Sequence, residues 1–194
     1  LTLSPLKDSQ VLNNIGYAKQ IHSDRVLNYE GALEEGDAII ASLDGTALGV
    51  FTADCVPILI ADASKRVVAA VHSGWKGTYE NILGKTLQRL MDEYCCHVND
   101  LILYIGPHIR SCCYEVGQEL KKKFIEKGFG EENFTDTNLD LCSCIINEAL
   151  ACGILKESIH SVDLCTRCEA STQLHSYRRD GNESGRNFSF VFLG

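Results

Sequence analysis

Four short β-like runs between residues 37 and 72 constrain the fold most strongly. They cover residues 37–42, 47–53, 57–61 and 66–72, with turn residues at Asp44-Gly45 and at 62–65. Two of them, Ile58-Leu59-Ile60 and residues 67–71, are apolar without alternation. Continuous apolar runs are typical of strands that are covered on both faces. The sequence therefore predicts strands buried between other layers.

The later part of the chain has helical patterns. Apolar residues from Tyr79 to Tyr94 recur at steps of three and four, which predicts an amphipathic helix. Further helices are expected over residues 117–127 and 139–152, and further strands over 101–105, 158–164 and 188–193. Consecutive strands followed by helices indicate an α+β fold. At 194 residues, the chain is expected to form a single domain over residues 1–194.

Composition excludes several classes of partner. The chain has 18 Lys and Arg against 26 Asp and Glu, a net charge of −8, and its longest basic run is the three lysines 121–123. A nucleic-acid groove or an anionic membrane surface needs a basic patch, so neither is expected. The longest apolar run, residues 46–53, is too short to span a bilayer. Ten cysteines without a signal-peptide pattern favour a reducing, cytoplasmic compartment.

Candidate chemistry lies where two predicted strands end. Cys55 follows one strand and His72 ends another, so both can meet at the rim of a sheet, where small-molecule sites form. The following loop contains Gly74 and Gly77 and opens onto a helix. Its free N–H groups, with the charge of Lys76, could receive an anion. The residues alone leave the other interpretation open, a buried structural thiol and a hydrogen-bonded imidazole.

Three arginines form a second cationic group in this acidic chain. Arg178, Arg179 and Arg186 fall within nine residues beside glycines and could make a wall that binds an anion or stacks on a purine. A solvated charge cluster is the alternative. His108, which follows Gly106-Pro107, could also face a pocket.

The remaining cysteine pairs are expected to be structural. Cys165 and Cys168 have the spacing of half a zinc site or of a redox pair, but no second such pair lies at zinc-finger spacing. Cys112 and Cys113 are adjacent, and adjacent side chains do not easily face one site. We therefore expect all four to be buried or paired structural residues.

Several motifs occur together in a characteristic order. They are Gln20-Ile21-His22, Thr52-Ala53-Asp54-Cys55, His72-Ser73-Gly74-Trp75-Lys76-Gly77, Gly106-Pro107 with residues 112–117, and residues 176–181 with Gly185-Arg186-Asn187. With this set, the chain closely resembles the YfiH/YlmD/FAMIN family, whose members carry the label laccase-domain or polyphenol oxidase proteins. The resemblance covers essentially the whole chain.

The resemblance implies a layered α/β/β/α sandwich with mixed sheets and a zinc site made by His22, Cys55 and His72. It also implies a purine nucleoside phosphorylase that acts on adenosine, inosine, guanosine and methylthioadenosine and deaminates adenosine, with purine nucleosides and phosphate as partners. Cys55, His72 and Asp54 are then the expected catalytic residues, and Gly74, Lys76, Gly77 and the three arginines the expected substrate and phosphate ligands. Family members usually have a further N-terminal segment, which this sequence is expected to lack.

Two other functions fit parts of the pattern. A metal-free hydrolase would use Cys55 as nucleophile and His72 as base, with Asp54 or Asp37 orienting the base. His22 discriminates against it, because a Cys–His dyad has no need of a second imidazole. A catalytically silent, zinc-stabilised binding module would keep the metal and bind nucleosides poorly. The laccase label itself is rejected, because six histidines without a His-x-His pair do not suit a multicopper centre.

Overall fold

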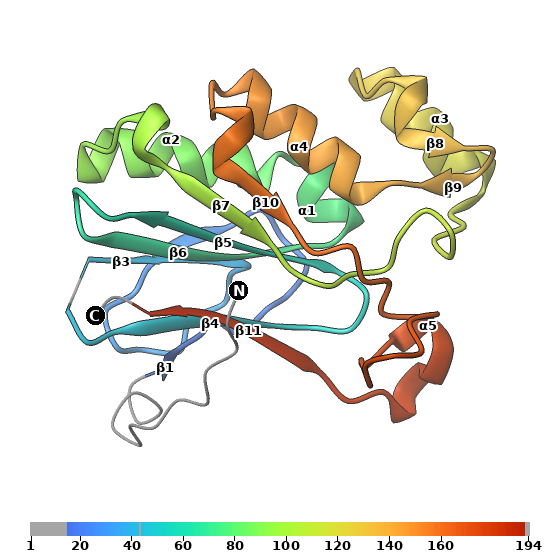
Figure 1. Cartoon of the computed structure of the whole chain (residues 1–194), viewed down its shortest axis with the longest axis horizontal. Coiled ribbons are helices and arrows are strands. Elements are labelled where there is room, and N and C mark those ends of the chain that lie inside the picture. Colours follow the sequence, from blue (N-terminus) through green and yellow to red (C-terminus); the bar gives the residue numbers. More distant parts are fainter. Residues whose placement is uncertain (1–14, 43, 193–194) are drawn as a thin grey trace.

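The computed structural model describes residues 15–42 and 44–192, and its strands form two main sheets that lie one above the other (Figure 1). The larger sheet has the strand order β10-β7-β5-β6-β3-β2. Its strands are β2 (Val26–Asn28), β3 (Ala38–Ala41), β5 (Val56–Asp62), β6 (Val67–Ser73), β7 (Ile102–Ile105) and β10 (Ile159–Ser161). The smaller sheet has the order β1-β4-β11, from β1 (Ile15–Gly16), β4 (Ala47–Thr52) and β11 (Asn187–Phe192). Both sheets mix parallel and antiparallel pairs.

Helices cover the face of the larger sheet that points away from the smaller one (Figure 1). The helices are α1 (Trp75–Tyr79), α2 (Ile82–Tyr94), α3 (Gly117–Lys127), α4 (Leu141–Ala151) and α5 (Tyr177–Asp180). α1, α2 and α4 lie over this face, whereas α5 lies near the start of β11 (Figure 1). A small hairpin of β8 (Phe134–Thr135) and β9 (Asn138–Leu139) lies beside α3. The predicted α+β class with layered, mixed sheets is confirmed.

Successive residues of the central strands enter two different cores. Ala69 of β6 belongs to a buried cluster with Leu87 of α2, and the next residue, Ala70, belongs to a cluster with Leu48 of β4. Side chains of a strand alternate between faces, so a strand with a helix layer on one side and a sheet on the other must be apolar throughout. This burial explains the continuous apolar runs of the sequence.

The helix expected from Tyr79 onwards is interrupted. Asn81 lies between α1 and α2 with φ of 63°, and its side chain accepts a hydrogen bond from the backbone N–H of Gly84. Asparagine tolerates this left-handed conformation, and the same residue caps the N-terminus of α2. The helix over residues 117–127 has the predicted bounds and is closed by Gly128, with φ of 109°.

The connection between the two sheets forms the rim at which the sequence places Cys55 and His72. β4 of the smaller sheet ends at Thr52, and the chain turns through Ala53, Asp54 and Cys55 into β5 of the larger sheet. β5 pairs antiparallel with β6, so Pro57 lies opposite His72. Cys55 and His72 therefore lie at the same end of the two sheets. Within the described residues, no helix is both long and apolar enough to cross a membrane.

Candidate active site

Three side chains from separate segments converge at this end of the sheets. His22 lies in the loop before β2, Cys55 in the turn between β4 and β5, and His72 near the end of β6. One ligand atom from each lies within 4.8 Å of the other two. The two imidazole rings meet edge to face, with their centroids 4.8 Å apart. We call these three residues the His–Cys–His cluster.

Asp37, directly before β3, holds two members of this cluster in place. One carboxylate oxygen lies 2.7 Å from Nδ1 of His72 and accepts the backbone N–H of His22 at 3.0 Å. The other oxygen accepts both the backbone N–H and the hydroxyl of Ser23 at 2.6 Å. Because Asp37 occupies Nδ1 of His72, Nε2 is the nitrogen left for a ligand. A carboxylate behind a ligating imidazole is the usual arrangement at metal centres, where it fixes the ring and raises its basicity.

Charges within the cluster stabilise one another. Burial acts to raise the pKa of Asp37, but hydrogen bonds from His72 and Ser23 outweigh it and lower the pKa to about 2. Burial acts to lower the pKa of His72, but Asp37 and Cys55 raise it to about 9. Burial also acts to raise the pKa of the Cys55 thiol, but the two imidazoles lower it to about 7. The thiol is therefore readily ionised, as a metal ligand must be.

The cluster opens into a cavity of about 610 Å³. Its wall carries four aromatic side chains, Tyr17, Phe51, Tyr114 and Tyr177, and two guanidinium groups, Arg178 and Arg186. Arg178 lies over the ring of Tyr114, 5.3 Å from its centroid. An apolar cavity with a few convergent polar groups is typical of a small-molecule site.

Asp54 lines the cavity but its carboxylate is already engaged. It accepts the hydroxyl of Thr166 at 2.7 Å and the backbone N–H of Arg178 at 2.6 Å. Asp54 is buried, with φ of 92°. Its carboxylate therefore ties the start of α5 to the β4–β5 turn, and Asp37, not Asp54, is the carboxylate that orients His72.

The other predicted substrate residues divide into two groups. Arg178 and Arg186 lie in the cavity wall, whereas Arg179 does not: its guanidinium donates to the carbonyls of Thr166 and Leu174 and to Asp180. These contacts fix the segment after Cys165 to α5. His108 is fully buried against the Gly106 carbonyl and is not part of the wall either.

The loop that follows His72 approaches the side chains of the cluster at Gly74. A Cβ atom at this position would lie 2.9 Å from Sγ of Cys55 and 3.4 Å from Cδ2 of His22, so a side chain here would displace the cluster. Gly77 packs against Ile82, and Lys76 is exposed over the ring of Trp75. Lys76 does not line the cavity. Its expected contact with phosphate stays a prediction.

A family model described as "Multi-copper polyphenol oxidoreductase laccase" matches residues 6–194. The chain belongs to this laccase-domain family. The resemblance seen in the motifs is thus confirmed. Laccase-domain relatives include a purine nucleoside phosphorylase of Clostridium acetobutylicum, 45% identical over 96% of this chain and 80% of the relative. Another is adenosine deaminase RL5 from an unknown prokaryote, 32% identical over 93% of this chain and 76% of the relative.

Solved structures of laccase-domain proteins share the fold. The hypothetical protein YfiH of Bacillus licheniformis superposes with a TM-score of 0.86 at 28% identity, over 95% of this chain and 77% of its own. YlmD of Geobacillus stearothermophilus gives the same TM-score at 26% identity, over 94% of this chain and 74% of its own. The relatives named as phosphorylase and deaminase indicate that this laccase-domain chain is an enzyme.

Proposed function

We propose that this protein is a zinc-dependent purine nucleoside phosphorylase that also deaminates adenosine, with adenosine, inosine, guanosine and methylthioadenosine as substrates. The observation that carries the proposal is the His–Cys–His cluster at the base of an aromatic, arginine-bearing cavity. The names of the relatives from Clostridium acetobutylicum and from the unknown prokaryote support the two activities.

The donor set of the cluster suits zinc. Zinc is a borderline-soft ion that binds both thiolate and imidazole, and three protein ligands are the usual number at a catalytic zinc. The hydrogen bond that Nδ1–H of His72 donates to Asp37 supplies the outer support that such a site needs. A bound zinc ion would supply Lewis acidity and lower the pKa of a bound water toward about 7.

The cavity wall suits a nucleoside and phosphate. The rings of Tyr17, Phe51, Tyr114 and Tyr177 offer faces on which a purine can stack. Arg178 donates to the Glu115 carbonyl and Arg186 to the carbonyls of Ser184 and Gly185. Each guanidinium has five N–H groups, so both keep donors for a phosphate.

Phosphorolysis requires the protein to position the nucleoside and the phosphate, and no covalent bond to the protein needs to form. A phosphate oxygen forms a bond to C1′ of the ribose while the bond from C1′ to the purine nitrogen breaks, giving ribose 1-phosphate and the free base. We propose that Arg178 and Arg186 orient the phosphate and that the aromatic wall holds the base. Asp54 acts as a positioning residue, because it holds the backbone of Arg178.

A Cys–His hydrolase is the second candidate, and one observation favours it. Cys55, His72 and Asp37 are arranged in the order of nucleophile, base and orienting carboxylate. His22 favours the metal site, since it completes a cluster that a dyad would not need. All ten cysteines are free thiols, which fits the reducing, cytoplasmic location that we propose. Both candidate activities are compatible with that location.

Inosine cleavage with and without phosphate tests the proposal. The zinc-loaded protein should form hypoxanthine and ribose 1-phosphate only when phosphate is present, and should release ammonia from adenosine. His22→Ala should lose both activities, whereas His97→Ala, outside the cluster, should keep them. An inosine cleavage rate that does not depend on phosphate and is unchanged in His22→Ala would support the hydrolase. A zinc-loaded protein that turns over no nucleoside would indicate a silent binding module.

A further inference from the structure

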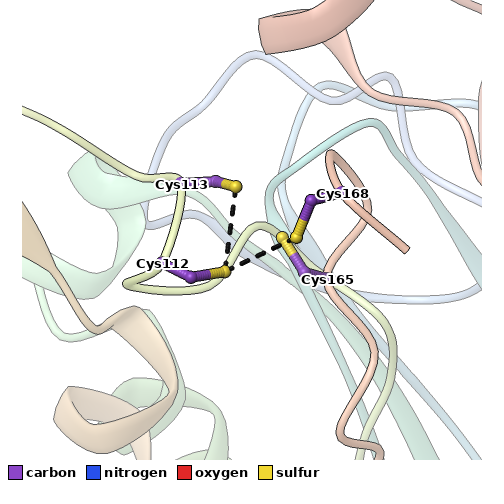
Figure 2. A group of neighbouring side chains, drawn as sticks. All are labelled: Cys112, Cys113, Cys165 and Cys168. Atoms are coloured by element: carbon purple, nitrogen blue, oxygen red, sulfur yellow. Dashed lines mark hydrogen bonds between the residues drawn. The ribbon is translucent and has the colours of Figure 1, made fainter. Parts of the chain in front are cut away.

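Four cysteines that were expected to be buried or paired structural residues meet at one point outside the cavity. Figure 2 shows two of them extending from one loop toward the other two, which lie on a second loop. Their sulfur atoms all lie within 4.8 Å of one another. The members of this four-cysteine cluster are Cys112, Cys113, Cys165 and Cys168. The expectation that adjacent cysteines would not face one site is therefore wrong.

Two tight turns explain how adjacent residues face one point. In the first, the backbone N–H groups of Cys113 and Tyr114 both donate to the carbonyl of Arg110. In the second, the N–H of Glu169 donates to the carbonyl of Cys165. A β-bridge between His108 and Cys165 and an ion pair of 2.7 Å between Arg110 and Asp163 hold the two turns together. The sulfurs are thus brought together by backbone structure from both loops.

The spacing of the sulfurs fits a tetrahedral metal. Sγ of Cys112 lies 3.7 Å from Sγ of Cys113 and 3.7 Å from Sγ of Cys168. Four thiolates held at about 2.3 Å from a tetrahedral zinc lie about 3.8 Å from one another. A disulfide would require one of these pairs to close to about 2.05 Å.

Backbone N–H groups favour the thiolate of one cluster member, Cys165. Burial acts to raise the pKa of Cys165, but backbone N–H groups of Arg110, Cys168 and Arg167 lower it to about 7. The pKa of the Cys112 thiol is raised, first by burial and then by the neighbouring sulfurs. Four thiols this close cannot all ionise without a cation among them.

We propose that the four-cysteine cluster binds one zinc ion through four thiolates, as a structural metal site separate from the His–Cys–His cluster. A closed set of four cysteines is the usual form of a structural zinc site. One of the two turns it joins leads into the cavity wall, and the other holds a wall residue by a hydrogen bond. Tyr114 directly follows Cys113, and Thr166, directly after Cys165, donates to Asp54. The metal would therefore fix the side of the cavity that presents Tyr114 and Arg178.

Zinc counting with matched variants tests this site. Protein prepared with a thiol reductant and freed of loose metal should contain two zinc ions per chain. The double variant Cys165→Ser/Cys168→Ser should contain one, and so should Cys55→Ala, which removes the other site. Cys95→Ser, an exposed cysteine outside both clusters, should contain two. One zinc in the unaltered protein, lost in Cys55→Ala, would overturn the proposal.

An alkylation footprint on the unaltered protein keeps the proposal testable if the double variant fails to fold. With zinc bound, the four cysteines of the cluster should react slowly with iodoacetamide while Cys95 reacts fast. After chelation, all four should become reactive together. Fast alkylation of the cluster in the zinc-loaded protein would contradict the proposal. So would a Cys112–Cys168 disulfide in freshly reduced and reisolated protein, or iron in place of zinc in the purified protein.

Discussion

Asp37 lies behind the His–Cys–His cluster and contacts two of its three members, although it is not a ligand. Its carboxylate carries the charge that faces His72 and the loop of His22 and Ser23. Asp37→Asn should weaken zinc binding at this cluster about 10- to 100-fold, the usual effect of losing an outer partner of a ligating histidine. Competition with a chromophoric chelator measures the affinity. Asp92→Asn, on the surface of α2, is the control, and an unchanged affinity in Asp37→Asn would refute the role given to this carboxylate.

The raised pKa of His72 and the lowered pKa of Cys55 predict a pH-dependent metal affinity. Metal-free, His72 is protonated at pH 7 because its pKa is about 9, and Cys55 is half ionised because its pKa is about 7. Both protons must leave when zinc binds, so binding should release about 1.5 protons at pH 7 and about 0.5 at pH 9. Affinity should therefore rise with pH over this range. Calorimetry in buffers of different ionisation enthalpy counts the protons, and no release at pH 7 would contradict a protonated His72.

Some elements of the fold could be predicted from the sequence and others could not. The strands from β3 to β6 were predictable, because burial on both faces leaves an uninterrupted apolar run. The break at Asn81 was not, because a left-handed asparagine between two apolar helical turns leaves the helical period intact. The four-cysteine cluster was missed because two loops far apart in the chain form it, through the bridge between His108 and Cys165.

The candidate site, too, was predictable from the sequence only in part. The sequence, with its family resemblance, pointed to all three members of the His–Cys–His cluster, but it offered Asp37 and Asp54 as equivalent candidates for the orienting role. Only the structure distinguishes the two carboxylates, because Asp37 accepts a hydrogen bond from Nδ1 of His72 whereas Asp54 accepts one from the hydroxyl of Thr166. The different roles of Arg178 and Arg179 likewise follow from where α5 points each side chain.

The contact between α2 and α4 contains a carboxyl group that opposes folding at high pH. Glu148 of α4 accepts the N–H of Gly84 at 3.0 Å, and burial raises its pKa to about 7. Since the pKa is raised on folding, its contribution to stability is full below about pH 4.5 and is lost as pH rises through 7. Glu148→Gln, which keeps an acceptor for Gly84, should gain about 2–3 kcal/mol relative to the unaltered protein between pH 5 and pH 8.5. Denaturant titrations at the two pH values measure the gain, and an equal difference at both would rule out a titrating Glu148.

For the whole molecule, we expect the core to stay folded without a metal. The two buried clusters on either face of the larger sheet contain the apolar residues of the strands and helices, and the metal candidates lie at their rim. Chelated protein should therefore keep its far-UV circular dichroism, melt at a lower temperature and lose phosphorolysis. Circular dichroism and the inosine assay on the same chelated sample check this. Outright unfolding would make both metals structural and favour a silent binding module.

The central claim is that the metal held by the His–Cys–His cluster is required for phosphate-dependent cleavage of nucleosides. Cys55→Ala and Cys95→Ala each remove one thiol, the first inside the cluster and the second outside it. The decisive measurement is zinc content together with the rate of inosine phosphorolysis on the same preparation of each variant. We predict that Cys55→Ala loses one zinc ion and at least about 100-fold in rate, because a ligand matters at least as much as its outer partner, while Cys95→Ala loses neither. Full zinc content and an unchanged rate in Cys55→Ala would contradict the claim.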